Sequence, residues 1–215
     1  MEIIKAVLFE PVGCLAEFPA EEFNEIAAEV LDLQGNPSES GSEAYWQMLD
    51  LMQAAPYPLA AGQAQRAEAL ELQAVERADL YEDVGQALAE LKGMGISLII
   101  ASSLSAAAVN RFVDRFALGG FFSGVWTRDN AGGVKAAPLA KAIEGGSFQA
   151  DSVMSLCDTT EGLHVAKEVG ANAILMFNDY DEGKRLAAHG PAGAIVSLHE
   201  LPDAIRFVAE GAKRG

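Results

Sequence analysis

The sequence is poor in cysteine, in basic residues and in long apolar stretches. Its only cysteines, Cys14 and Cys157, form no C-x-x-C pair and lie in no histidine-associated spacing, so we expect no zinc site, and reduced thiols are typical of the cytoplasm. No apolar run reaches the roughly 18–20 residues that a membrane-spanning helix needs. The N-terminus has no basic segment leading into an apolar stretch, as a secretory signal would. We therefore expect a cytoplasmic protein with no membrane partner.

Positive charge is also scarce. Fifteen Lys and Arg stand against 31 Asp and Glu, which gives a formal net charge of −16. Binding to nucleic acid or to anionic membranes depends largely on Lys and Arg, so we expect neither as a partner. A small anionic substrate remains compatible with this charge, because one local pocket can be positive on an acidic protein.

What is present is a regular alternation of short apolar runs and amphipathic helical patterns, in a 215-residue chain that is 50% hydrophobic. The predicted strands are Ile3–Phe9, Ser97–Ala101, Gly124–Arg128, Val153–Cys157, Ala173–Phe177 and Ala194–Val196. The predicted helices between and after them are Asp83–Met94, Ala106–Phe116, Ala137–Glu144, Glu161–Val169, Asp181–Ala188 and Leu201–Lys213. Continuous apolar strands are typical of a parallel sheet that is covered on both faces. We therefore predict a doubly wound α/β domain that binds ligands beyond the carboxyl ends of its strands.

One region interrupts the alternation. Between about Glu17 and Asp79 there is no convincing strand, and three helical stretches are predicted: Ala20–Leu33, Glu43–Gln53 and Ala60–Asp79. We predict an all-helical cap at 17–79, inserted after the first strand into an α/β core formed by 1–16 and 80–215. Its apolar face would pack on the other cap helices, shield the cleft or form a dimer interface, so both a monomer and a homodimer stay open; the face consists of Tyr45, Trp46, Met48, Leu49 and Met52.

Polar side chains follow several of the predicted strands. Glu10 and Asp158 each come directly after a strand, Ser102 lies between a strand and a helix, and Lys135 lies in a loop that enters a helix. The carboxyl ends of parallel strands meet at one sheet edge, so these four side chains should converge there. A carboxylate nucleophile, hydroxyl and amide donors, an ammonium group and a metal ligand are the groups that phosphoryl transfer requires.

The order and spacing of these segments resemble the haloacid dehalogenase-like (HAD) superfamily over essentially the whole chain. The segment 9–15, Phe-Glu-Pro-Val-Gly-Cys-Leu, looks like the family motif F-D-x-D-G-T-L. Ser102 falls on the Ser/Thr motif, and Lys135, in Lys-Ala-Ala-Pro, falls on the lysine of K-P-x-P. The segment 158–162 matches D-S-x-x-G. The resemblance implies a Rossmann-like three-layer core with a parallel sheet, and the helical cap of the phosphoglycolate phosphatase-like subgroup.

The resemblance also implies a site. Glu10, Ser102, Lys135 and Asp158 would be the catalytic residues, acting on a small phosphorylated metabolite. Mg²⁺ would be held weakly by Glu10, Asp158, a backbone carbonyl near Val12 and waters, since one or two carboxylates with water suffice for this ion. Two simpler interpretations stay open: Ser102 as a plain helix N-cap, and Lys135 as the ion-pair partner of Glu10 or Asp158.

The first motif departs from the family pattern at the positions that carry the chemistry. Glu10 stands where the family has its nucleophilic Asp, and Val12 stands where the phosphatases have their acid/base Asp. The extra methylene of Glu10 moves the attacking oxygen by roughly 1 Å, which can slow the reaction ~10²-fold. Loss of the acid/base group slows it by another ~10²–10⁴-fold. We therefore expect phosphatase activity to be weak or lost.

Two alternatives belong to other functional classes. The chain could be a pseudoenzyme that binds a small anion, or a protein partner through its cap, without catalysis. It could also be a 2-haloacid dehalogenase, since those enzymes lack an Asp at the position of Val12 and use no metal. They require the nucleophilic Asp, however, and carry Asn where this chain has Ser103, so we rank this alternative below the phosphatase.

Overall fold

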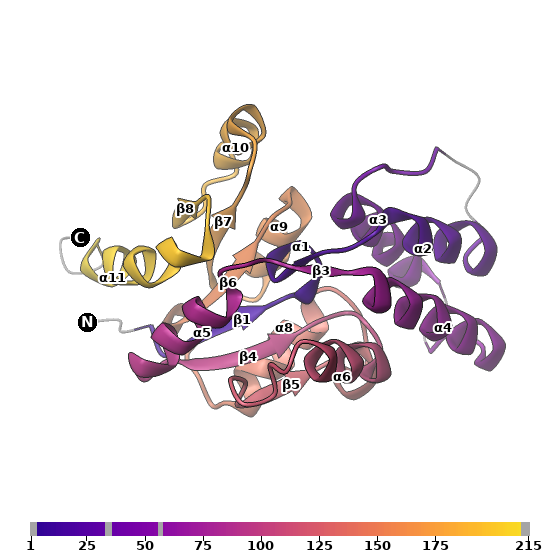
Figure 1. The fold of residues 1–215 in the computed structure, drawn as a ribbon, viewed down its shortest axis with the longest axis horizontal. Coiled ribbons are helices and arrows are strands. Elements are labelled where there is room, and N and C mark those ends of the chain that lie inside the picture. The colour runs from indigo at the N-terminus through magenta and orange to yellow at the C-terminus, as the bar shows by residue number, and fades with distance from the viewer. Residues whose placement is uncertain (1–3, 33–35, 56–57, 212–215) are drawn as a thin grey trace.

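Six strands form one parallel sheet in the order β5-β4-β1-β6-β7-β8 (Figure 1). They are β1 (Ala6–Phe9), β4 (Ser97–Ala101), β5 (Gly124–Trp126), β6 (Val153–Cys157), β7 (Asn172–Met176) and β8 (Gly193–Ile195). This computed structural model describes residues 4–32, 36–55 and 58–211, without the side chains of 209–211. Ile3, Leu33, residues 56–57 between two of the predicted helices, and the end of the last predicted helix lie outside the described residues.

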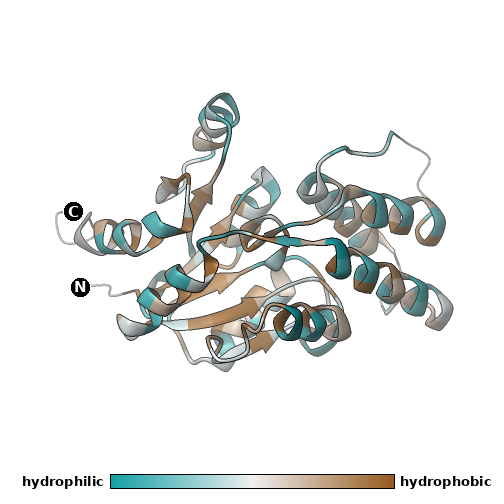
Figure 2. Cartoon of the chain, viewed as in Figure 1, coloured by the Kyte–Doolittle hydropathy of each residue, from teal (hydrophilic) through white to brown (hydrophobic). Residues whose placement is uncertain are grey.

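Strand β1 lies at the centre of the sheet, between β4 and β6. Val7 pairs with Leu98 on one side and with Met154 on the other, and all three side chains are buried. The strands are correspondingly the most apolar segments in Figure 2. The chain runs from β1 outward through β4 and β5, then returns to place β6, β7 and β8 on the other side. The strand order reverses at β1, and in α/β sheets ligands bind at such a reversal.

Helices cover both faces of the sheet. Among the described residues they are α5 (Val84–Gly93), α6 (Ala106–Arg115), α7 (Arg128–Ala131), α8 (Ala136–Gly145), α9 (Thr160–Glu168), α10 (Tyr180–Ala187) and α11 (Leu201–Gly211), with the 3-10 turns η2 (Ala150–Ser152) and η3 (Leu198–Glu200). Helix α5 packs on α11, and α8 packs on α9; in Figure 1, α5 lies in front of the sheet and α8 behind it. This arrangement confirms the predicted three-layer α/β fold. No described helix has the length and hydrophobicity to cross a bilayer.

The segment between β1 and α5 is mostly helical, as predicted. Helix α2 (Ala20–Glu25) continues as a π-helical turn, η1 (Ile26–Val30), and packs on α3 (Gly41–Ala54) and α4 (Ala61–Arg77). The three helices lie together at the carboxyl end of β1 (Figure 1). The division of the chain into a core and a separate cap stays a prediction.

Two short strands that the sequence does not predict lie at the two boundaries of this segment. Strands β2 (Ala16–Glu17) and β3 (Asp79–Leu80) pair with each other in an antiparallel ladder, which joins the two ends of the helical segment. Two residues are too few to show the alternation by which a strand is recognised in a sequence. The ladder therefore escapes sequence analysis, although it fixes where the helical segment leaves and rejoins the sheet.

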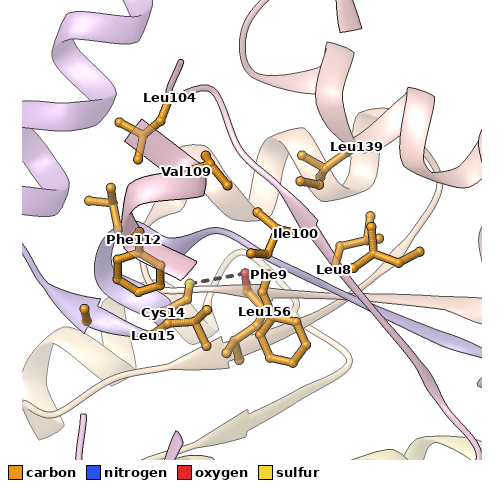
Figure 3. Close-up of a cluster of buried hydrophobic side chains, with 14 of the residues drawn as sticks. Leu8, Phe9, Cys14, Leu15, Ile100, Leu104, Val109, Phe112, Leu139 and Leu156 are labelled. Atoms are coloured by element: carbon orange, nitrogen blue, oxygen red, sulfur yellow. Dashed lines mark hydrogen bonds between the residues drawn. The ribbon is translucent and has the colours of Figure 1, made fainter. Parts of the chain in front are cut away.

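A continuous apolar core supports the carboxyl end of β1. Figure 3 shows Phe9, Leu15, Ile100 and Phe112 among its side chains, all of them fully buried. Cys14 belongs to the same cluster, where its thiol donates to the Leu156 carbonyl over 3.4 Å. Burial raises the pKa of the Cys14 thiol well above 9.0. A buried thiol with a raised pKa is a packing group and a poor nucleophile.

Candidate active site

The turn after β1 positions the first carboxylate. Glu10 is still extended (φ −89°, ψ 128°), and the short helical turn α1 (Pro11–Cys14) follows it. Gly13 in this turn has φ +76°, and a Cβ there would lie 1.8 Å from Oδ2 of Asp158 and 2.3 Å from Oγ of Ser42. Only glycine permits both this conformation and this close approach. The turn therefore brings the Asp158 carboxylate directly against the β1 loop.

Hydrogen bonds from Ser102, Tyr45 and Ser103, and one from the Val12 backbone, hold the Glu10 carboxylate. Ser102 Oγ donates to Oε1 over 2.5 Å, and the Tyr45 hydroxyl, from α3, donates to Oε2 over 2.8 Å. The Ser103 amide also points to Oε2, at 3.3 Å, and it lies 3.1 Å from the Tyr45 oxygen. Burial raises the pKa of Glu10 from 4.5 to about 7, against the lowering effect of these hydrogen bonds. Both oxygens of the predicted nucleophile are thus already engaged.

Ser102 is placed as a hydroxyl donor and not as a helix cap. Helix α6 begins at Ala106, and its N-cap is Ser105, whose side chain accepts from the Ala108 amide over 3.2 Å. Ser102 Oγ instead accepts from the Leu104 amide and donates to Glu10. The N-cap interpretation of Ser102 is therefore wrong. Its hydroxyl can donate to only one acceptor at a time, and here that acceptor is Glu10.

Lys135 occupies the N-cap position of α8 and lines the same cavity as the two carboxylates. Its backbone has φ +58°, and its amide donates to Ser103 Oγ over 2.7 Å. Its ammonium group forms an ion pair with Asp50 of α3. The interpretation of Lys135 as an ion-pair partner of Glu10 or Asp158 is therefore wrong, because helix α3 supplies a carboxylate that sequence spacing could not reveal.

Asp158 directly follows β6, the strand that flanks β1 on the side opposite β4. Ser42 of α3 hydrogen-bonds to its carboxylate, and burial raises its pKa from 3.8 to about 6. Glu10, Lys135 and Asp158 line one cavity, and Ser102 reaches that cavity through its bond to Glu10. The structure thus brings the four predicted site residues to one sheet edge, as strand topology requires.

The cavity that these residues enclose is very small. It measures about 20 Å³, which is room for about one water molecule. Trp46 of α3 lines it from the side of the helical segment. Together with Tyr45, whose hydroxyl reaches Glu10, Trp46 closes the site. All five side chains of this apolar face belong to the buried core, and two of them, Tyr45 and Trp46, also reach the cleft.

A buried ion pair connects helix α4 to the loop that contains Ser103 and Ser105. Glu71 of α4 and Arg128 of α7 pair with each other, with 0% and 7% of their side chains exposed. Glu71 also accepts from the Ser105 amide over 3.1 Å, and Arg128 donates to the Ser103 carbonyl over 3.1 Å. Neither of these residues, nor the role of Tyr45, was predicted from the sequence. The signals present in the sequence were a lone Glu within the apolar stripe of a helix, and a phenol that must find a partner when buried.

The binding of Mg²⁺ by Glu10, Asp158 and a carbonyl near Val12 stays a prediction, and the described structure limits how the ion could be held. In residues 4–32, 36–55 and 58–211, no three His, Cys, Asp or Glu side chains come close enough to hold a metal. Mg²⁺ keeps several waters in near-octahedral geometry, and beside Glu10 there is room for about one. Weak binding by Glu10, Asp158 and a carbonyl near Val12 stays a prediction that requires the site to open.

Comparison with known proteins identifies the family. Residues 33–176 match the sequence model described as "Haloacid dehalogenase-like hydrolase". Searching curated proteins gives no significant match.

Solved structures agree in fold. A haloacid dehalogenase-like hydrolase from Streptococcus pneumoniae superimposes with a TM-score of 0.69 at 15% identity, over 94% of this chain and 99% of that one. A predicted phosphoglycolate phosphatase from Haemophilus somnus gives 0.64 at 14% identity, over 94% and 98%. A HAD family hydrolase from Deinococcus radiodurans, solved with bound phosphate and sodium, gives 0.67 at 17% identity, over 97% and 98%. At these identities the likeness concerns the fold alone.

Proposed function

The chain belongs to the haloacid dehalogenase-like hydrolases, and we propose that it is a phosphatase-type member whose activity on small phosphorylated metabolites is weak or lost. One observation carries this proposal. Both oxygens of Glu10 are hydrogen-bonded, one of them to the Tyr45 hydroxyl, and the cavity at this carboxylate measures about 20 Å³ and is lined by Trp46. A phosphoryl group has no place beside the carboxylate that would have to attack it.

Each step of phosphoryl transfer lacks a group in this arrangement. Attack requires an ionised carboxylate with a free oxygen in line with phosphorus, and Glu10 has a raised pKa and engaged oxygens. The Ser102 hydroxyl and Ser103 amide would have to stabilise the equatorial oxygens, but they bind Glu10. Protonation of the leaving group requires an acid, and Val12 cannot supply a proton. Lys135, which would balance charge, is paired with Asp50.

The test is phosphate release from a panel of phosphorylated metabolites, with and without Mg²⁺. We expect the unmodified protein to release little or no phosphate above the Lys135→Ala variant, which controls for contaminating phosphatases. Release as fast as that of a family phosphatase with both motif carboxylates, and lost in Lys135→Ala, would refute the proposal, because it would make Glu10 a fully working nucleophile.

Restoration of the motif separates the chemical defect from the steric one. Glu10→Asp with Val12→Asp restores the family's two carboxylates, but Tyr45 would still close the site, so we expect little release. Adding Tyr45→Ala to this pair should raise release strongly, whereas Tyr45→Ala alone should not. If the pair alone is fully active, the closure by Tyr45 is not a barrier and that part of the argument fails.

The same closed site supports a second candidate, a pseudoenzyme that acts by binding alone. A protein partner through the helical segment, or an anion after opening of the site, would each fit this function. Silence of the restored triple variant in a folded sample would favour this candidate, because it would show that the rest of the pocket no longer supports catalysis. The 2-haloacid dehalogenase alternative predicts halide release from short 2-halocarboxylates without metal, and the engaged Glu10 oxygens argue against it.

A further inference from the structure

One face of helix α3 supplies a polar partner to three of the four predicted site residues. The pairs are Ser42 with Asp158, Tyr45 with Glu10, and Asp50 with Lys135. Ser42, Trp46 and Asp50 are each four residues apart, so they form one row along the helix, and Tyr45 adjoins that row. A single helix face therefore occupies most of the polar groups at which a ligand would bind.

Two glycines allow this face to lie close against the site. At Gly41, the first residue of α3, a Cβ would lie 1.9 Å from the Phe18 carbonyl oxygen. At Gly13, in the loop after β1, a Cβ would lie 2.3 Å from Ser42 Oγ. Non-bonded heavy atoms prefer a separation of about 3.5–4.0 Å, so a larger side chain at either glycine would push α3 away. The sequence thus favours the occupied arrangement both at the start of the helix and in the loop that the helix covers.

The pair of Asp50 with Lys135 blocks the positive group of the site. Lys135 is the only cationic residue among the described residues that line the cavity at Glu10. The carboxyl groups of Glu10 and Asp158 do not attract an anion, so the binding of one would depend on the Lys135 ammonium group. Asp50 already forms an ion pair with that group. Because a carboxylate and a phosphate group are both oxyanions that bind an ammonium ion, Asp50 competes with an anionic ligand at this position.

The contacts that occupy the site are reversible. The side chain of Asp50 is 60% exposed and that of Lys135 is 12% exposed, and an ion pair that reaches solvent is weak. The Ser103 amide lies 3.1 Å from the Tyr45 hydroxyl and 3.3 Å from Oε2 of Glu10, so it keeps an acceptor if the tyrosine withdraws. A ligand binds such a site with an affinity that is reduced by the fraction of molecules in which the site is free. The occupied state therefore lowers the affinity for a ligand without destroying the site.

We propose that α3 is an autoinhibitory element whose polar face occupies the site. A small oxyanion of the phosphate type binds at Lys135 only when it displaces the Asp50 carboxylate. The Ser42 and Tyr45 contacts hold the helix in place and so oppose this displacement. The inference rests on the proposed function, since it concerns the same site, and it adds a reversible restraint to the two substitutions in the first motif.

Binding of inorganic phosphate, followed by phosphorus NMR titration, tests this proposal without any turnover. Asp50→Asn removes the competing charge with little change in size. It should raise the affinity for phosphate about tenfold, the effect of a hydrogen bond to a charged group. Adding Tyr45→Phe, which keeps the ring, should raise the affinity about fivefold more. Adding Lys135→Ala to Asp50→Asn should abolish the gain, because the anion would lose its cation.

A matched control makes the same chemical change elsewhere. Asp151→Asn removes an exposed carboxylate just before β6, at the opposite end of that strand from Asp158, and it should leave the affinity for phosphate unchanged. Thermal melts would verify that each variant is folded. Equal affinities of the unmodified protein and Asp50→Asn, no binding by any variant, an equal gain in Asp151→Asn, or a gain that survives Lys135→Ala would overturn the proposal.

The proposed function can fail independently of this inference. Its failure is fast phosphate release by the unmodified protein, whereas the inference fails when the variants bind phosphate no better than that protein does. Weak turnover without a gain in affinity would therefore leave the proposed function intact and remove only the autoinhibitory role of α3.

Discussion

Replacement of Glu10 by Gln should stabilise the protein, and the gain should depend on pH. Burial raises the pKa of Glu10 from 4.5 to about 7, so the folded state holds this proton more tightly than the unfolded state does. Stability from this group is fully present below pH 4.5 and is lost as pH rises to about 7, where the folded protein must also ionise. Glutamine removes that loss, because it never ionises.

The pKa values set the size of the effect. The difference between the pKa values of 4.5 and about 7 corresponds to a change in the free energy of unfolding on the order of 3 kcal/mol. The Glu10→Gln variant should therefore gain about this much relative to the unmodified protein at pH 8, and nothing from this source at pH 4. A change in the hydrogen bonds to Ser102 and Tyr45 also alters the difference in the free energy of unfolding between the two proteins, but by an amount that does not depend on pH. The pH dependence of the difference is the diagnostic quantity.

Urea unfolding monitored by circular dichroism across this pH range measures the effect. Asp158, with a pKa raised to about 6, also lowers the free energy of unfolding as pH rises. It is present in both proteins, so its contribution cancels in the difference between them. Glu39→Gln makes the same chemical change at an exposed side chain and should show no pH-dependent difference of this size. A difference for Glu10→Gln that is constant from pH 4 to pH 8 would refute the assignment of a buried, raised carboxyl at this position.

Further predictions concern the supports of the site. Gly13→Ala should destabilise the protein by about 2–5 kcal/mol, because a Cβ at this φ of +76° would overlap Asp158. Gly85→Ala, in open space on α5, should raise the Tm. Equal Tm values for the two variants would contradict the left-handed conformation of Gly13. Glu71→Gln should destabilise by about 3–5 kcal/mol, since it removes the negative charge of the buried carboxylate that pairs with the Arg128 guanidinium. Glu71→Met with Arg128→Met should lose less in urea unfolding. Mg²⁺ against EDTA should leave the Tm almost unchanged, because the closed site has no room for the hydration shell of the ion; a large rise would show that the site opens to bind it.

The strands and their parallel arrangement were predictable from the sequence because they follow from apolar patterning. Strands β4 and β6 have the bounds expected from their continuous apolar runs. The convergence of Glu10, Ser102 and Asp158 followed from the same reasoning, since parallel strands place their carboxyl ends together. These features depend on residues close to one another along the chain.

The partners of the site residues were not predictable in this way. Tyr45 and Asp50 reach Glu10 and Lys135 from a helix about 35 and 85 residues away in the chain, and neither contact has a local signature. The size of the cavity depends on how α3 packs against the sheet, which periodicity does not specify. Whether the site is open or closed is therefore a property of tertiary packing that a motif cannot reveal.

The loop from Ser102 to Ser105 connects the sheet to helices α3 and α4. Tyr45 of α3 lies 3.1 Å from the Ser103 amide nitrogen, and Glu71 of α4 lies 3.1 Å from that of Ser105. Neither helix can lift away without exposing a buried amide, so the helical segment and the loop should unfold as one cooperative unit. In native-state hydrogen exchange, the amides of Ser103 and Ser105 should then be protected almost to the level of the central strands, whereas the loop ends of an independently moving lid would exchange early.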